Sequence, residues 1–143
     1  MPADLDFLTT ALVRLDGCLA VLRRLAALSE AELLTDPIPL GSAERYLQVS
    51  IEICLDIAHH LISAEDLRVP DTYADAFAVL VEGQIVQRDY LPTAQRMARF
   101  RNRLVHLYWD VEAEAIYAIL QTRLDDFERY KAFIVAYMSR AGT

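Results

Sequence analysis

Residues 5–26 read LDFLTTALVRLDGCLAVLRRLA, and their apolar positions recur at alternating intervals of three and four residues. The repeat runs through Leu5, Leu8, Leu12, Leu15, Leu19, Leu22 and Ala26. Because an α-helix has about 3.6 residues per turn, this spacing gathers the apolar side chains into one continuous stripe. The stretch therefore predicts a long amphipathic helix that buries this stripe against neighbouring helices.

The remaining chain repeats the helical pattern, and no stretch shows the alternation of a β-strand. Ser29 and Glu32 form a capping-box pattern that opens a short helical turn, and the segment 35–41, with its two prolines, is expected to be a loop. Longer helices are predicted from the N-cap Ser42 to about Ser63, from Tyr73 to Gly83, from Pro92 onward, and from the N-cap Asp110 to about Met138. We therefore expect an all-α, up-and-down bundle of about five helices, forming a single domain over residues 1–143.

The helix predicted from Ser42 carries apolar residues on two stripes instead of one. A helix that is apolar over so much of its circumference is buried on more than one side. Two arrangements remain open: the helix lies at the centre of the bundle, or one of its faces contacts a second copy of the chain. The second arrangement predicts a homodimer.

The length, the apolar runs and the cysteine positions of the chain indicate where in the cell the protein acts. The chain has 143 residues and a formal net charge of −7, without an apolar run long enough for a membrane span or a basic, apolar secretion signal at its start. Cys18 and Cys54 lie inside apolar helical patterns and read as buried thiols. We expect a cytoplasmic protein with no contact to a membrane.

The negative net charge argues against a generic nucleic-acid-binding protein, because phosphate groups are bound by basic surfaces. The charge is unevenly distributed, however: residues 88–109 hold five arginines and one acid, so this segment is basic.

The sequence FRNRLVHLYW at residues 100–109 concentrates the polar chemistry of this basic segment. On a helix, Asn102 and His106 are neighbours at positions i and i+4, and Arg101 and Tyr108 lie two turns apart on one stripe. An imidazole can exchange a proton at neutral pH, and a guanidinium can stabilise charge on a phosphate. Such a set suits metal-independent cleavage of RNA through its own 2′-hydroxyl.

Helical spacing alone does not bring this set together. Arg101 and His106 are about 140° apart around a helix, so a long side chain, a frayed helix end or a partner subunit is needed for both to reach one phosphate. The alternative is that solvated arginines flank a helix end that carries a structural histidine.

The pattern Arg101-x4-His106-x-Tyr108 closely resembles the signature of the HepT-like toxins of the HEPN superfamily (higher eukaryotes and prokaryotes nucleotide-binding domains). The resemblance extends to LDIAHHLI at residues 55–62, to LRVP at 67–70 with Tyr73 after it, and to residues 111–120. It covers the chain from about Glu44 to Phe133.

This resemblance implies a HEPN-like homodimer whose subunits line a shared cleft, and a metal-independent endoribonuclease without a cofactor. Arg101 and His106 would be the catalytic pair, and we expect Arg99, Asn102 and Arg103 to bind the RNA substrate. Tyr108 matches the tyrosine that a minimal nucleotidyltransferase antitoxin modifies with AMP. The expected partners are therefore RNA, this antitoxin and a second copy of the chain, with further assembly in the antitoxin complex.

Other readings of the chain stay open. Asp56, His59 and His60 have a spacing that could bind a metal, although packing or lining of the cleft is favoured, with His60 as the residue expected at the cleft. Five tyrosines at helical spacing are interpreted as core or interface residues: Tyr46, Tyr73, Tyr117, Tyr130 and Tyr137. Two rival functions remain, a non-catalytic helical module that binds RNA or nucleotide, and a structural adaptor for a nucleotidyltransferase.

Overall fold

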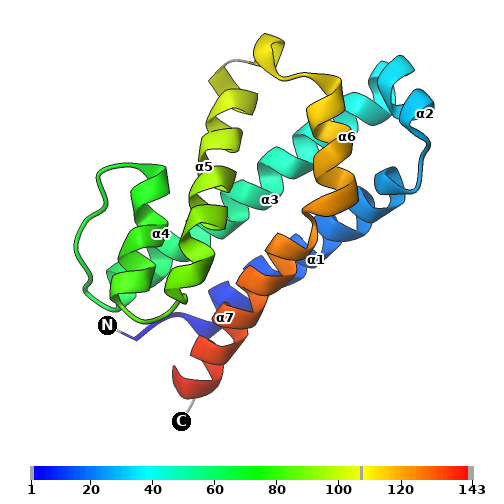
Figure 1. Ribbon diagram of the computed structural model, residues 1–143. Coiled ribbons are helices and arrows are strands. Elements are labelled where there is room, and N and C mark those ends of the chain that lie inside the picture. The colour runs from blue at the N-terminus through cyan, green and yellow to red at the C-terminus, as the bar shows by residue number, and fades with distance from the viewer. Residues whose placement is uncertain (1, 107, 142–143) are drawn as a thin grey trace.

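The computed structural model describes residues 2–106 and 108–141, with only the backbone described for Tyr108. Within those ranges the chain forms α-helices and two 3-10 turns, without a β-strand (Figure 1). The α-helices are α1 (Leu5–Ala26), α2 (Glu30–Thr35), α3 (Pro37–Ala64), α4 (Tyr73–Glu82), α5 (Leu91–His106), α6 (Ala113–Thr122) and α7 (Asp125–Ala141), and the 3-10 turns are η1 (Arg88–Tyr90) and η2 (Tyr108–Asp110). The predicted all-α class is confirmed, and two helices more than expected are present.

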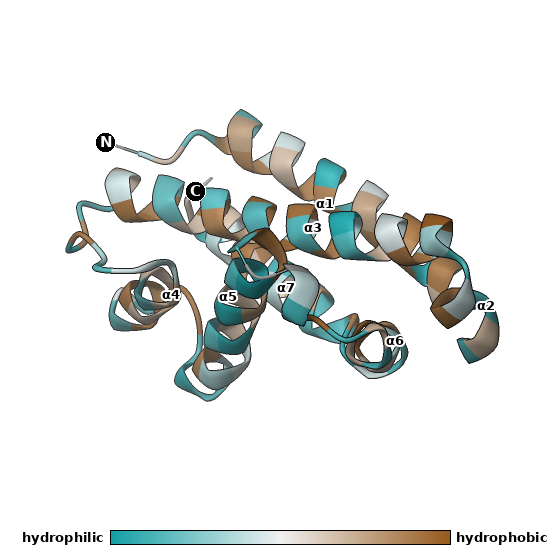
Figure 2. Cartoon of the chain, turned by 90° about the horizontal axis from the view of Figure 1, so that it is seen from above, coloured by the Kyte–Doolittle hydropathy of each residue, from teal (hydrophilic) through white to brown (hydrophobic). Residues whose placement is uncertain are grey.

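Helix α3 lies at the centre of the bundle. It packs against α1 on one side and against α4, α5 and α6 on the other (Figure 2). Most of both predicted apolar stripes is consequently buried, for example at Ile53 and Ile57 on one stripe and at Ile51 and Ile62 on the other. The central position is thus sufficient to explain the two stripes without a second copy of the chain.

Local capping interactions begin the first helices where the sequence predicts them. The Asp4 carboxylate accepts a hydrogen bond from the Phe7 backbone N–H at the start of α1. Ser29 and Glu32 form the predicted capping box at the start of α2, each side chain bonding the other's backbone N–H. These bonds satisfy backbone donors that have no partner within a helix.

Helix α3 begins five residues earlier than predicted, and the loop expected at residues 35–41 is wrong. Asp36 is the N-cap, with its carboxylate accepting from the Ile38 N–H at 3.0 Å, and Pro37 takes the first helical position. A proline is tolerated there because the first-turn N–H groups have no helical acceptor. The prolines therefore start this helix and do not stop it.

The single helix expected from Asp110 to Met138 is also wrong, because the chain divides there into α6 and α7 at Arg123 and Leu124. The N-cap of α6 is Glu112 and not Asp110. The apolar stripe continues through the break, with Leu120 and Leu124 both buried, so periodicity could not locate it. The break lets α6 reach α1 and α2, while α7 contacts α3 through Tyr130, whose hydroxyl donates to the Cys54 carbonyl.

The turn before α4 is fixed by a small ionic network. The Arg68 guanidinium binds Asp75 with hydrogen bonds of 2.7 and 2.9 Å and Glu82 with two of 2.8 Å. The Asp75 carboxylate also accepts from the Asp71 N–H, and Thr72 caps the helix. Through these bonds α4 and its first residue, Tyr73, are held in one place relative to α3.

Cys18 and Cys54 are free and buried, which confirms their interpretation as small apolar residues. None of the helices in the described ranges combines the length and the apolar content needed to cross a membrane.

Candidate active site at the end of helix α5

Helix α5 separates the predicted site residues onto two sides. Its inner side carries the buried residues Ala94, Met97, Ala98 and Leu104, and Arg101 shares this side with a side chain only 15% exposed. Arg99 and Arg103 are exposed on the outer side. The inward direction of Arg101 follows from its helical register, which places it among the residues that pack on α3.

The Arg101 guanidinium makes contacts in several directions at once. Its Nη2 lies 3.7 Å from Glu52 Oε2 on α3, and its Nη1 donates to Asn102 Oδ1 at 3.2 Å. Its Cζ lies 5.0 Å from the centre of the Tyr73 ring, a cation–π contact with the first residue of α4. Its Nε is buried without a hydrogen-bond partner. This arginine is therefore held between α3 and α4.

A polar cavity of about 180 Å³ opens beside Arg101. It is lined by Glu52, Leu55, Asp56, His59, Tyr73 and Arg101. The His59 ring lies 5.9 Å from the Tyr73 ring, so this imidazole and the Arg101 guanidinium both contact the same tyrosine. The cavity is several times the roughly 30 Å³ that a water molecule occupies in the liquid, which is enough space for a chemical group of a substrate.

His106 is the last residue of α5 and is exposed. Arg101 faces inward and His106 does not, so one subunit leaves the predicted catalytic pair on different sides of the helix. Tyr108 begins the 3-10 turn η2, and its side chain lies outside the described part of the structure. The Arg103 guanidinium donates to the Asp110 carbonyl at 3.1 Å, which ties η2 back to the end of α5.

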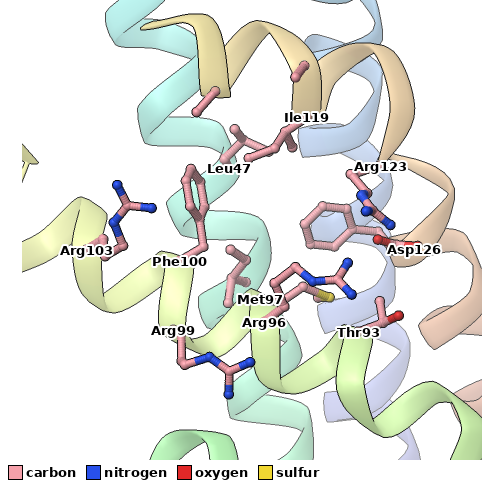
Figure 3. Close-up of a pocket in the computed structure, with 14 residues that line it drawn as sticks. Leu47, Thr93, Arg96, Met97, Arg99, Phe100, Arg103, Ile119, Arg123 and Asp126 are labelled. Atoms are coloured by element: carbon pink, nitrogen blue, oxygen red, sulfur yellow. The ribbon is translucent and has the colours of Figure 1, made fainter. Parts of the chain in front are cut away.

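A groove of about 510 Å³ lies between α5 and the helices α3, α6 and α7 (Figure 3). The residues of α5 that line it are on another side of this helix from Arg101 and its cavity. Its interior is apolar, and Figure 3 shows Leu47, Phe100 and Ile119 facing the hollow. Four arginines line it as well: Arg96, Arg99, Arg103 and Arg123. The predicted substrate-binding residues Arg99 and Arg103 therefore belong to this groove, whereas Asn102 contacts Arg101.

The electrostatics of the groove favour an anion. Asp126 is the single acidic residue among those that line it. Burial raises the pKa of the Asp126 carboxyl, and the nearby Arg123 and Arg96 guanidiniums act in the opposite direction. No carboxylate of the described chain lies within ion-pair distance of Arg96, Arg99 or Arg123. Positive charge around an apolar floor suits a phosphate-bearing ligand with a flat, apolar base.

Several residues lie elsewhere than the sequence predicted. His60, expected at the cleft, accepts a hydrogen bond from the Asp4 N–H at 2.9 Å and contacts the Phe7 ring, so it anchors the N-terminus. Its neighbour His59 lines the cavity instead. Tyr73 is 44% exposed and lies against Arg101, so it is not a core residue, and its place in an interface stays a prediction. Among the described residues, no group of three or more His, Cys, Asp and Glu side chains is placed to hold a metal ion.

Sequence reasoning missed Glu52 entirely. The only signal was its position on α3 one turn after Gln48 and one turn before Asp56, which aligns three polar residues on one side of the helix. A polar face on a central helix indicates a site. The residue that contacts this face, Arg101, lies on α5, some fifty residues later in the chain, so residue spacing cannot identify it.

The ribonuclease HepT-like family matches the chain over residues 15–134, which includes the whole of α3, α4 and α5. The chain belongs to the ribonuclease HepT-like family. The resemblance in the motif at residues 101–108 is therefore part of a family relationship that extends over most of the HepT-like chain.

Two curated relatives carry nuclease names. The mRNA nuclease HepT of Shewanella oneidensis is 29% identical over 84 residues, covering 59% of this HepT-like chain and 63% of the relative. The tRNA nuclease HepT of Aphanizomenon flos-aquae is 27% identical over 95 residues, covering 66% of this chain and 65% of the relative. In both cases, the match spans less than two thirds of the relative's length.

Solved structures share the HepT-like fold. A crystal structure of a toxin–antitoxin complex with AMP-PNP matches with a TM-score of 0.85 at 22% identity, over 92% of this chain and 98% of the other. The tri-AMPylated HEPN toxin of Shewanella oneidensis in complex with an MNT antitoxin gives 0.84 at 23% identity, with the same coverage. The cytosolic protein YutE of Bacillus subtilis gives 0.84 at 18% identity, over 98% and 94%. At these identities, the likeness establishes the fold.

Proposed function

We propose that this HepT-like chain is the toxin of a HEPN/MNT toxin–antitoxin pair, a metal-independent endoribonuclease that acts in the cytoplasm as one domain. The observation that carries the proposal is the family match over residues 15–134, within which Arg101 is held at a polar cavity and His106 is exposed at the end of the same helix. The nuclease names of the two curated relatives support it.

The proposed reaction is attack of an RNA 2′-oxygen on its own neighbouring phosphorus. The O2′–P bond forms and the P–O5′ bond breaks, leaving a 2′,3′-cyclic phosphate and a 5′-hydroxyl. A base takes the proton of the 2′-hydroxyl, and an acid gives a proton to the departing O5′. We assign proton transfer to His106 and stabilisation of the phosphorane charge to Arg101, which lines the polar cavity.

The proposed site needs two copies of the chain. Within one subunit, Arg101 faces α3 and α4, whereas His106 is exposed away from it. Each chain also offers only one motif histidine, and the reaction uses both an acid and a base. Trp109 directly follows the motif and is 71% exposed, and aromatic rings of this kind are enriched at protein interfaces. A homodimer that joins the two motif regions supplies two imidazoles at one cleft.

We assign substrate binding to the groove lined by Arg99 and Arg103, with Asn102 acting through its hydrogen bond from Arg101. The groove places guanidinium groups around an apolar floor, as single-stranded RNA requires. The proposed regulator is a minimal nucleotidyltransferase that transfers AMP to Tyr108. A relative of the same fold is tri-AMPylated in its complex with an MNT antitoxin.

The first test is cleavage of RNA by the purified chain in the presence of EDTA. His106→Ala should lower the rate by about 100-fold or more, the usual contribution of a positioned acid or base. Arg101→Ala should lower it by about 100- to 1000-fold, because it removes a preorganised positive charge. Arg14→Ala, which removes an exposed arginine on α1, is the matched control and should leave the rate unchanged.

The two rival functions give other results in the same experiment. A chain that binds RNA with a salt-dependent affinity but cuts it at no measurable rate is a binding module. A chain that neither cuts nor binds RNA, yet forms a stable complex with the nucleotidyltransferase, is an adaptor. Cleavage that is equal in the wild type and in His106→Ala would show a contaminating nuclease and reject the assignment.

A further inference from the structure

The carboxylate of Glu52 connects two different helices and leaves neither of its oxygens without a partner. Gln48 Nε2 donates to Oε1 at 2.8 Å from one turn earlier on α3, and Arg101 Nη2 lies 3.7 Å from Oε2. The Glu52 side chain is 33% exposed and that of Arg101 is 15% exposed. Glu52 is therefore oriented on its own helix before it contacts the arginine of α5.

Stability does not account for this pair. An ion pair that retains contact with water contributes little to folding, because water already stabilises both charges in the unfolded chain. A carboxylate beside an arginine also opposes the binding of a phosphate, because the two negative charges repel each other. For a chain that acts on RNA, a negative charge at this position is unfavourable unless it serves another purpose.

The negative charge of Glu52 can serve to orient the Arg101 guanidinium. An arginine side chain has many accessible rotamers, and an unfixed guanidinium would lose this freedom only when RNA binds. Here Glu52, the Tyr73 ring and the Asn102 amide restrain the guanidinium from different directions, while its buried Nε stays without a partner. A charge fixed in advance stabilises a transition state more than one that must first reorganise.

We propose that Glu52 is a positioning residue, which holds the Arg101 guanidinium in the geometry that meets the phosphate. This inference rests on the proposed nuclease function. Glu52 acts through Arg101 and does not contact the RNA. Its removal should therefore affect the rate of the bound complex more than the affinity for RNA.

The test compares Glu52→Ala, Glu52→Gln and the control Glu44→Gln, which changes a half-buried glutamate two turns earlier on α3. A fluorogenic oligoribonucleotide gives kcat and KM separately. Glu52→Ala should lower kcat by about 10- to 100-fold, the loss expected from a misplaced catalytic group, and leave KM unchanged or lower. Glu52→Gln keeps an oxygen acceptor and should recover most of kcat, and Glu44→Gln should behave as the wild type.

Two further measurements separate positioning from a general structural role. The melting temperature of Glu52→Ala should stay close to that of the wild type, because the pair contributes little to folding. The Arg101 Nε–H should give a resolved ¹⁵N-HSQC signal in the wild type, assigned by its loss in Arg101→Ala, and this signal should shift or broaden in Glu52→Ala.

Some outcomes would overturn the inference. It fails if Glu52→Ala keeps the wild-type kcat, or if kcat falls only together with the melting temperature and Glu52→Gln does not recover it. If the wild-type chain cuts no RNA, the nuclease proposal fails separately. An Arg101 Nε–H signal unchanged in Glu52→Ala would then reject the positioning role as well.

Discussion

At the scale of single residues, the end of α5 places three functional groups within one short stretch of chain. Arg101 is fixed in the interior of the bundle, His106 ends the helix, and Tyr108 starts the next turn. The spacing matters because a modified Tyr108 would carry its phosphate only two residues from the exposed imidazole. A nucleotide in this position would add both bulk and negative charge to the proposed RNA site.

Tyr108→Phe should therefore separate the proposed nuclease from its proposed regulation. The variant lacks the acceptor oxygen for AMP but keeps Arg101 and His106, so we expect cleavage to remain within a few-fold of the wild type. Co-expression with the nucleotidyltransferase should silence the wild type and leave the variant toxic. Growth, cellular RNA integrity and the intact mass of the chain measure the three effects together.

The control is a nucleotidyltransferase with its catalytic carboxylates replaced, which should silence neither form. If the intact antitoxin silences Tyr108→Phe as completely as the wild type, neutralisation occurs by binding alone, and the role assigned to Tyr108 is wrong.

At the scale of elements, the turn before α4 decides where Tyr73 meets Arg101. The Arg68 guanidinium holds Asp75 and Glu82 on α4, and it thereby fixes the start of that helix. The hydrogen bonds from Arg68 and from the Asp71 N–H lower the pKa of Asp75 to about 2, from an ordinary value of 3.8. Protonation of the Asp75 carboxylate should therefore weaken the hydrogen bonds that hold this turn.

The sign of the pH effect follows from the lowered pKa of Asp75. Its ionised form is stabilised in the folded chain, so its contribution to the free energy of unfolding is complete above pH 3.8 and is lost as the pH falls through about 2. Asp75→Asn should consequently be less stable than the wild type at neutral pH. The difference should narrow below pH 3.8 and disappear near pH 2, as measured by urea unfolding at a series of pH values.

Asp71→Asn is the matched control on the same turn. Its carboxylate makes no hydrogen bond or ion pair with the rest of the described chain, so this variant should follow the wild type at every pH. A gap between wild type and Asp75→Asn that stays constant down to pH 2 would contradict the role of the Arg68 network.

At the scale of the whole molecule, the proposed dimer can be tested by mixing two inactive variants. Arg101→Ala keeps His106, and His106→Ala keeps Arg101. If the site pairs Arg101 of one subunit with His106 of the other, each mixed dimer keeps one such pair at its cleft, with one imidazole where the wild type has two. Mixing the two variants, followed by subunit exchange, should therefore restore part of the wild-type cleavage.

The control for this experiment mixes Arg101→Ala with a double variant that carries both Arg101→Ala and His106→Ala. No Arg101 guanidinium is then present, so no activity should return. The molar mass of the wild type, measured by sedimentation, should be that of two chains at the concentrations where it cuts RNA. Activity that persists in a monomer, or mixtures that remain inactive despite exchange, would place the complete site within one subunit.

Local sequence patterns are enough to predict the helical class and the limits of several elements. The stripe from Leu8 to Leu22 is buried as its spacing predicts, and the capping box at Ser29 and Glu32 forms. The motif at Arg101 and His106 could be recognised because its residues are close together in the chain. These features depend on interactions within one or two helical turns, which spacing encodes directly.

Which side chains share a site depends on the tertiary structure. The break at Arg123 and the contacts from Arg101 to Glu52 and Tyr73 depend on how distant helices meet. The same holds for the exchange of roles between His59 and His60, since adjacent residues on a helix point about 100° apart and their neighbours come from other elements. Helical periodicity fixes the direction of a side chain relative to its own axis, but the packing of α1, α4 and α5 around α3 determines what that side chain meets.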